Sequence, residues 1–124
     1  MRRADVALSP NELAEVRAIL AAHLPPGARV AVFGSRASGR ARPFSDLDLL
    51  IEEPAQLDWR TRVALVEAFE ASDLPFRVDV VEAGWLAPAF AEQLRREAVT
   101  IFAPGADEPH TGGLAVNSPP TQAA

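Results

Sequence analysis

Residues 30–51 contain two apolar, strand-like segments joined by a short polar loop, and the second segment carries Asp46 and Asp48. A third aspartate, Asp79, lies in another apolar segment, residues 76–81. Acidic residues are depleted in strands and are almost never buried without a partner. Three acidic residues in the most strand-like parts of one chain therefore need partners. Two divalent cations bound to a triphosphate would be such partners.

The spacing of the first two aspartates places both on one face of a strand. Side chains at positions i and i+2 of a strand point to the same side, so Asp46 and Asp48 present adjacent carboxylates. Such carboxylates repel each other unless a cation lies between them, and magnesium prefers one or two carboxylates together with phosphate oxygens. The alternate positions of this segment are apolar and face the other way, toward helices: Leu47, Leu49 and Ile51.

A Gly-Ser pair follows the first of the two strand-like segments directly. Glycine at position 34 lets the backbone approach a phosphate closely. If a helical turn starts near Ser35, its amide groups point positive partial charge toward an anion. Three arginines of the following loop can reach the same anion: Arg36, Arg40 and Arg42.

Each of these features has a plainer interpretation. A Gly-Ser pair is most often a simple turn, and an Asp-x-Asp pair is often a strand end beside solvent. Asp79 could pair with Arg77 or Arg36, and the arginines could belong to a solvated loop. The functional hypothesis depends on the conjunction of these features.

Composition narrows the function classes. The chain has 124 residues, which predicts one domain, and it has no cysteine, which excludes thiol catalysis and thiolate metal sites. All twelve basic residues are arginine, so a lysine-dependent phosphate loop is excluded. The net charge of −5 argues against long nucleic acid as a partner. Without an apolar leader or membrane-length segment, we expect a cytoplasmic protein.

Hydrophobic periodicity predicts an α/β (α+β) fold with a small mixed sheet flanked by helices. Helices are expected after Ser9, after Asp58 and within residues 85–97. We predict one domain over residues 1–103 and a disordered tail over residues 104–124, which are rich in Pro, Gly, Ser and Thr. The first two strands lack a full crossover helix and are predicted to be antiparallel. The expected strands span residues 29–33, 46–52, 76–82 and 99–102.

These motifs together resemble the DNA polymerase β-like nucleotidyltransferase superfamily. The matching features are Gly34-Ser35, then Asp46-Leu47-Asp48, and later Asp79. The residues around these motifs, and the end of the domain at residues 94–102, resemble the minimal prokaryotic branch, the MNT proteins. The resemblance covers residues 13–102 and implies the polymerase β-like fold.

The resemblance also implies a reaction and a role for each motif residue. Asp46 and Asp48 would bind two Mg²⁺ ions, and Asp79 would bind the catalytic ion and help to activate an attacking hydroxyl. This hydroxyl would attack the α-phosphorus of ATP and release pyrophosphate. Gly34 and Ser35 would hold the β- and γ-phosphates. The resemblance leaves Arg36 as either a phosphate ligand or a packing residue.

Short MNT proteins resemble the antitoxins of HEPN–MNT toxin–antitoxin pairs. This implies that the chain binds a HEPN-type toxin as a hetero-oligomer and transfers AMP to it, typically to a tyrosine. A chain of this length is expected to have no separate domain for a small substrate, and it has no tyrosine of its own. Two alternatives stay open: an antitoxin that neutralises by binding alone, and a transferase acting on a small molecule.

Overall fold

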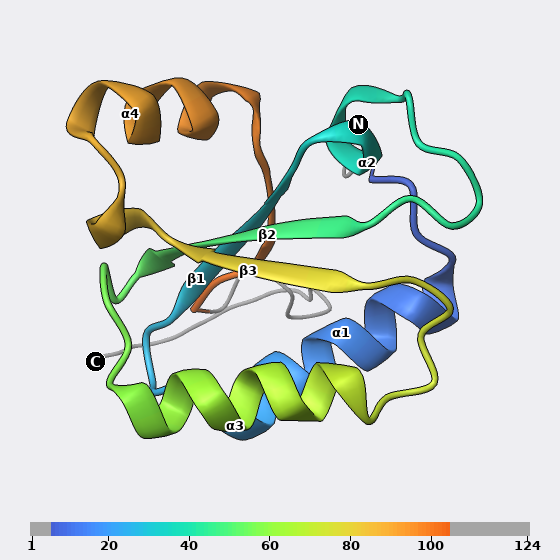
Figure 1. Ribbon diagram of the computed structural model, residues 1–124, viewed down its shortest axis with the longest axis horizontal. Helices are drawn as coiled ribbons and strands as arrows, with labels where there is room; N and C mark the ends of the chain where they lie inside the picture. Colours follow the sequence, from blue (N-terminus) through green and yellow to red (C-terminus); the bar gives the residue numbers. More distant parts are fainter. Residues whose placement is uncertain (1–5, 105–124) are drawn as a thin grey trace, which may run out of the picture.

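The computed structural model describes residues 6–104, which form a four-stranded sheet in the order β3-β2-β1-β4 (Figure 1). The pairs β1–β2 and β1–β4 are antiparallel, and β2–β3 is parallel. This confirms the predicted mixed sheet and the antiparallel first pair. The strands are β1 (Arg29–Phe33), β2 (Leu47–Glu53), β3 (Val78–Glu82) and β4 (Val99–Phe102).

Helices cover both faces of the sheet (Figure 1). The helices α1 and α3 pack on one face against the larger apolar core, and η1 and α4 lie on the other side, whereas Ala37 of the short helix α2 also packs against the larger core. Leu47, Leu49 and Ile51 belong to the larger core and Leu50 to the smaller one, so the predicted alternation along β2 is confirmed. The helices are α1 (Pro10–His23), α2 (Ser35–Ser38), α3 (Trp59–Glu70), η1 (Ala83–Trp85) and α4 (Pro88–Glu97).

Side-chain caps explain where two of the helices begin. Ser9 and Glu12 form a reciprocal capping box at the start of α1, and the Glu12 amide donates to the Ser9 hydroxyl over 3.1 Å. Asp58 accepts from the Thr61 amide at the start of α3, over 2.7 Å. Both caps were expected from the sequence and orient the helices that support the sheet.

Two strands begin later than predicted. The backbone amide of Leu47 donates to the Arg77 carbonyl over 2.8 Å, and the β2–β3 ladder runs from there. Asp46 therefore directly precedes β2 instead of opening it. Phe76 was expected in β3, but its ring is buried beneath the Arg36 guanidinium, 4.1 Å from the ring centroid, ahead of the ladder.

Most of the predicted tail, residues 105–124, lies outside the described residues, and the boundary after residue 103 stays a prediction. Within residues 6–104, no helix is both long enough and apolar enough to cross a membrane.

Candidate active site

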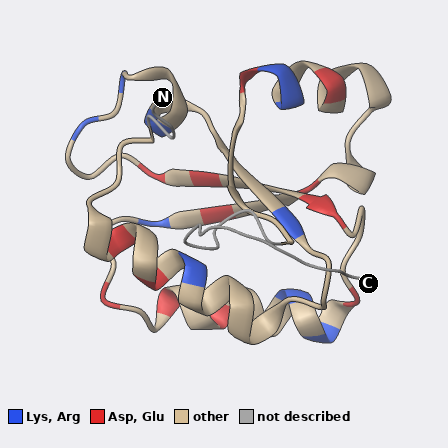
Figure 2. Ribbon diagram, turned by 180° about the vertical axis from the view of Figure 1, so that it is seen from behind, with Lys and Arg blue, Asp and Glu red and all other residues tan. Residues whose placement is uncertain are grey.

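The parallel pairing of β2 and β3 brings the three predicted aspartates to one end of the sheet. Asp48 lies directly opposite Asp79 in the ladder, and Asp46 precedes the start of β2. Figure 2 shows acidic segments, in red, on neighbouring strands of the sheet. The side chains of Asp46 and Asp79 are 46% and 40% exposed, so a ligand can reach them. We call these three residues the acid cluster.

Arg77 spans two members of the acid cluster. Its Nη2 atom lies 3.5 Å from Asp46 Oδ2, and its Nε atom lies 3.4 Å from Asp79 Oδ1. The sequence had suggested an Arg77–Asp79 pair as a plainer explanation of Asp79, and that pair is present. However, the arginine side chain is 72% exposed, and exposed ion pairs contribute little to stability. One exposed cation also leaves three carboxylates with excess negative charge.

The surroundings of Asp48 disfavour its charged form. Burial raises the pKa of its carboxyl, the negative charges of Asp79 and Asp46 raise it further, and Arg77 opposes them. Burial and the two neighbouring carboxylates thus both penalise the ionised form of Asp48. A cation placed among the three carboxylates would relieve this penalty, so the cluster fits a divalent metal.

Gly34 lies against the Asp48 carboxylate. Its backbone has φ 78° and ψ −154°, a region that is essentially reserved for glycine. A Cβ atom at position 34 would also overlap Asp48 Oδ2. The predicted Gly34-Ser35 turn is therefore beside the acid cluster, and Ser35 opens the short helix α2 as expected. Glycine is required here on two independent grounds.

Of the two roles that the sequence left open for Arg36, its burial and contacts favour packing. It is 5% exposed and donates from Nε to the Ser45 carbonyl over 3.0 Å and from Nη2 to the Pro43 carbonyl over 3.2 Å. Its Nη1 donates to the Ala7 carbonyl. This side chain fixes the loop that leads into Asp46, and the geometry provides no support for a phosphate contact.

The two other loop arginines behave differently. Arg40 is exposed and lines a small cavity of about 200 Å³ together with Gly34 and Glu97. Arg42 is exposed, and its backbone amide donates to the Ser45 hydroxyl over 2.8 Å. Arg40 therefore lines a cavity that reaches Gly34.

The acid cluster is not a closed metal cage. Within residues 6–104, no three acidic or histidine side chains converge tightly enough to hold an ion by themselves. Magnesium, however, is usually held by one or two carboxylates plus substrate phosphate oxygens. The acid cluster fits that mode of binding, because Gly34 lies beside it and leaves room for a phosphate near the carboxylates.

Comparison with known proteins identifies the family. Residues 13–102 match the nucleotidyltransferase domain family. This chain belongs to that family. A protein of Haemophilus influenzae named "Probable protein adenylyltransferase MntA" is 42% identical over 98 residues, which cover 79% of this chain and 85% of the relative. The resemblance inferred from the motifs is thereby confirmed, and the chain is a nucleotidyltransferase.

Two further similarities are more distant. An aminoglycoside (3'') (9) adenylyltransferase of Klebsiella pneumoniae is 35% identical over 85 residues, and the matched region is 67% of this chain but only 32% of that enzyme. A solved structure described as a toxin–antitoxin with AMP-PNP has a TM-score of 0.61 at 22% identity and covers 73% of each chain. This structural similarity confirms the fold class.

Proposed function

We propose that this nucleotidyltransferase is a magnesium-dependent antitoxin that transfers AMP from ATP to a tyrosine hydroxyl of a HEPN-type toxin. The observation that carries the proposal is the acid cluster beside Gly34, within a chain that is 42% identical to a probable protein adenylyltransferase. The description of the structural neighbour as a toxin–antitoxin with AMP-PNP is compatible with a toxin as the partner and an adenine nucleotide as the substrate.

Each residue of the site has a proposed role in this reaction. Asp46, Asp48 and Asp79 would hold the magnesium ions, which neutralise charge on the phosphates. The hydroxyl oxygen of the toxin attacks the α-phosphorus, and the bond from this phosphorus to the bridging oxygen of pyrophosphate breaks. Asp79, whose side chain is 40% exposed, would accept the hydroxyl proton. Gly34 and Ser35 would bring their backbone against the β- and γ-phosphates of the leaving pyrophosphate.

Two other functions remain as alternatives. The chain could neutralise a toxin by covering it, with no transfer of AMP. It could also modify a small molecule, because it shares 35% identity with aminoglycoside adenylyltransferases across about a third of their length. An inert complex would favour the first alternative, and drug resistance on expression would favour the second.

Intact mass spectrometry separates these functions. The chain is mixed with ATP, magnesium and the product of the neighbouring gene, which is expected to be a HEPN protein, and the masses of both proteins are measured. We expect one or more AMP units on the partner, no gain with Asp46→Asn, and a normal gain with Asp73→Asn, an exposed acid outside the cluster. A stable complex with no added mass would contradict catalysis and support neutralisation by binding.

A further inference from the structure

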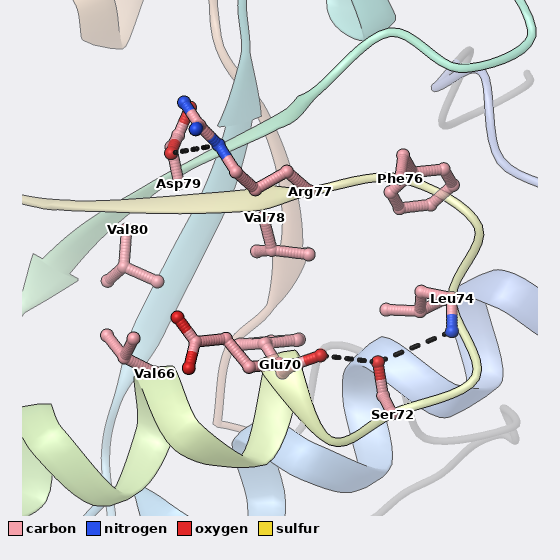
Figure 3. A pocket seen from close by; sticks show the side chains of 10 residues that line it. Val66, Glu70, Ser72, Leu74, Phe76, Arg77, Val78, Asp79 and Val80 are labelled. Atoms are coloured by element: carbon pink, nitrogen blue, oxygen red, sulfur yellow. Dashed lines mark hydrogen bonds and ion pairs between the residues drawn. The ribbon is translucent and has the colours of Figure 1, made fainter.

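A groove lies between strand β3 and helix α3, immediately beside the acid cluster. It measures about 650 Å³ and runs along the edge of the sheet (Figure 3). Its floor is apolar, and Glu70, Arg77 and Asp79 line its polar parts. We call it the β3–α3 groove. The apolar lining consists of Val66, Phe69, Leu74, Phe76, Val78 and Val80.

The backbone of β3 is open on the side of this groove. β3 is the terminal strand of the sheet and pairs only with β2 in the described residues. The Arg77 carbonyl accepts from β2, and alternate residues of a parallel strand direct their backbone groups to the same neighbour. The N–H and C=O groups of Val78 and Val80 therefore point to the open edge. Such an edge is a template for an added strand.

The side chains along β3 connect the groove to the acid cluster. In Figure 3, Val78 and Val80 point down toward α3, whereas Arg77 and Asp79 point to the opposite face. Asp79 thus lies on the same short strand that forms the upper wall of the groove. A strand added beside β3 would alternate in the same way, with one side chain beside Asp79 and its two neighbours directed into the groove.

We propose that the β3–α3 groove binds an extended segment of the protein substrate, which pairs with the edge of β3 and presents its hydroxyl beside Asp79. This inference rests on the proposed protein adenylylation. Continuity between the groove and the acid cluster favours the acceptor segment as the occupant, since the acceptor must reach Asp79. The residues that flank the modified position insert side chains over Val66 and Val80.

Glu70 specifies the chemistry of one flanking side chain. It lies at the end of α3, is exposed, and directs its carboxylate into the groove between the apolar side chains (Figure 3). Within residues 6–104 its carboxylate forms no ion pair. An arginine or lysine next to the acceptor hydroxyl would pair with it. The groove therefore favours a segment that combines apolar and basic residues around the hydroxyl.

Amide hydrogen exchange tests the docking mode without any catalysis. The full chain is measured alone and with the HEPN protein, in the absence of ATP. We expect slower exchange at Val78 and Val80, and no change at Thr100 on the opposite edge strand β4. Protection confined to other surfaces, such as the exposed Trp59 and Trp85, would overturn the proposal.

A charge reversal with a matched control tests the role of Glu70. Glu70→Lys should weaken the complex roughly fivefold, because an attraction becomes a repulsion at a solvent-accessible site. Glu67→Lys, on the exposed surface of the same helix but outside the groove lining, should leave the affinity unchanged. Equal effects of both variants, or no effect of either, would contradict a cation opposite Glu70.

These outcomes separate the docking mode from the proposed reaction. AMP transfer without protection of β3 would disprove the docking mode and leave the transferase function intact. Protection of β3 without transfer would disprove the reaction and leave the docking surface intact. A failure of the two proteins to associate would overturn both, because the groove would then lack the substrate that it is proposed to bind.

Discussion

Replacing Asp48 by asparagine should stabilise the ligand-free protein while abolishing its function. Asp48 lies directly opposite Asp79 in the parallel ladder, and burial and the neighbouring carboxylates raise its pKa. Asparagine has nearly the same shape and carries no charge. The substitution therefore removes a repulsion without opening a cavity.

The position of Asp48 opposite Asp79 sets the size of the expected gain in stability. Charged pairs directly opposite on neighbouring strands are worth about 0.2–1 kcal/mol, and like charges are unfavourable by a similar amount. We expect the free energy of unfolding to rise by about 0.5–1 kcal/mol, or roughly 2–6 °C in Tm for a domain of this size. Because the folded-state pKa of Asp48 is raised, its penalty on folding grows as the pH rises from the unfolded pKa and is complete above the folded pKa. The gain should therefore be full at neutral pH and vanish in acid, below the unfolded pKa.

Urea denaturation with and without ATP and magnesium provides the assay. Saturating ligand at a hundred times its Kd should stabilise the unmodified protein by about 2.7 kcal/mol, and this increment should disappear in Asp48→Asn. Asp73→Asn should change stability by less than about 0.5 kcal/mol and keep the increment. If Asp48→Asn lowered the stability of the ligand-free protein at neutral pH, the argument from carboxylate repulsion would be refuted.

Three further predictions concern residues outside the acid cluster. Gly34→Ala should cost about 1–3 kcal/mol in stability from backbone strain and weaken nucleotide binding by displacing the Asp48 carboxylate, as measured by urea denaturation and calorimetry. Arg36→Lys should cost about 2–4 kcal/mol, because lysine cannot reproduce the three backbone contacts; an unchanged denaturation midpoint would contradict the packing role. Glu82→Gln should cost about 1–3 kcal/mol at neutral pH. Hydrogen bonding to Arg62 lowers the pKa of Glu82, so its contribution is present above the unfolded pKa and is lost as the pH falls through the folded pKa; a thermal melt series should show the two proteins converging in acid.

Much of the fold followed from local sequence signals. The capping residues Ser9 and Asp58 located two helix starts, and the alternation along β2 correctly divided its side chains between two cores. The order of the strands could not be predicted from the sequence, because β4 is a short apolar segment whose neighbour is selected by tertiary packing.

The site was predicted unevenly for physical reasons. The acids and the Gly-Ser turn could be proposed from the sequence because their chemistry depends on residue type and spacing, and the structure brings them together. The role of Arg36 could not, since its acceptors are backbone carbonyls of residues 7, 43 and 45, which the fold brings together. The β3–α3 groove was also hidden, because it exists only where α3 packs beside the edge of the sheet.

The transfer of label from ATP to the partner tests the central claim most directly. Two reactions are run with the HEPN protein and magnesium, one with ATP labelled at the α-phosphorus and one with ATP labelled at the γ-phosphorus. Attack at the α-phosphorus predicts that the α-label appears on the partner and that the γ-label leaves in pyrophosphate. Label from the γ-phosphorus on the partner, or no α-label on a partner that is bound, would contradict a nucleotidyl transfer by this acid cluster.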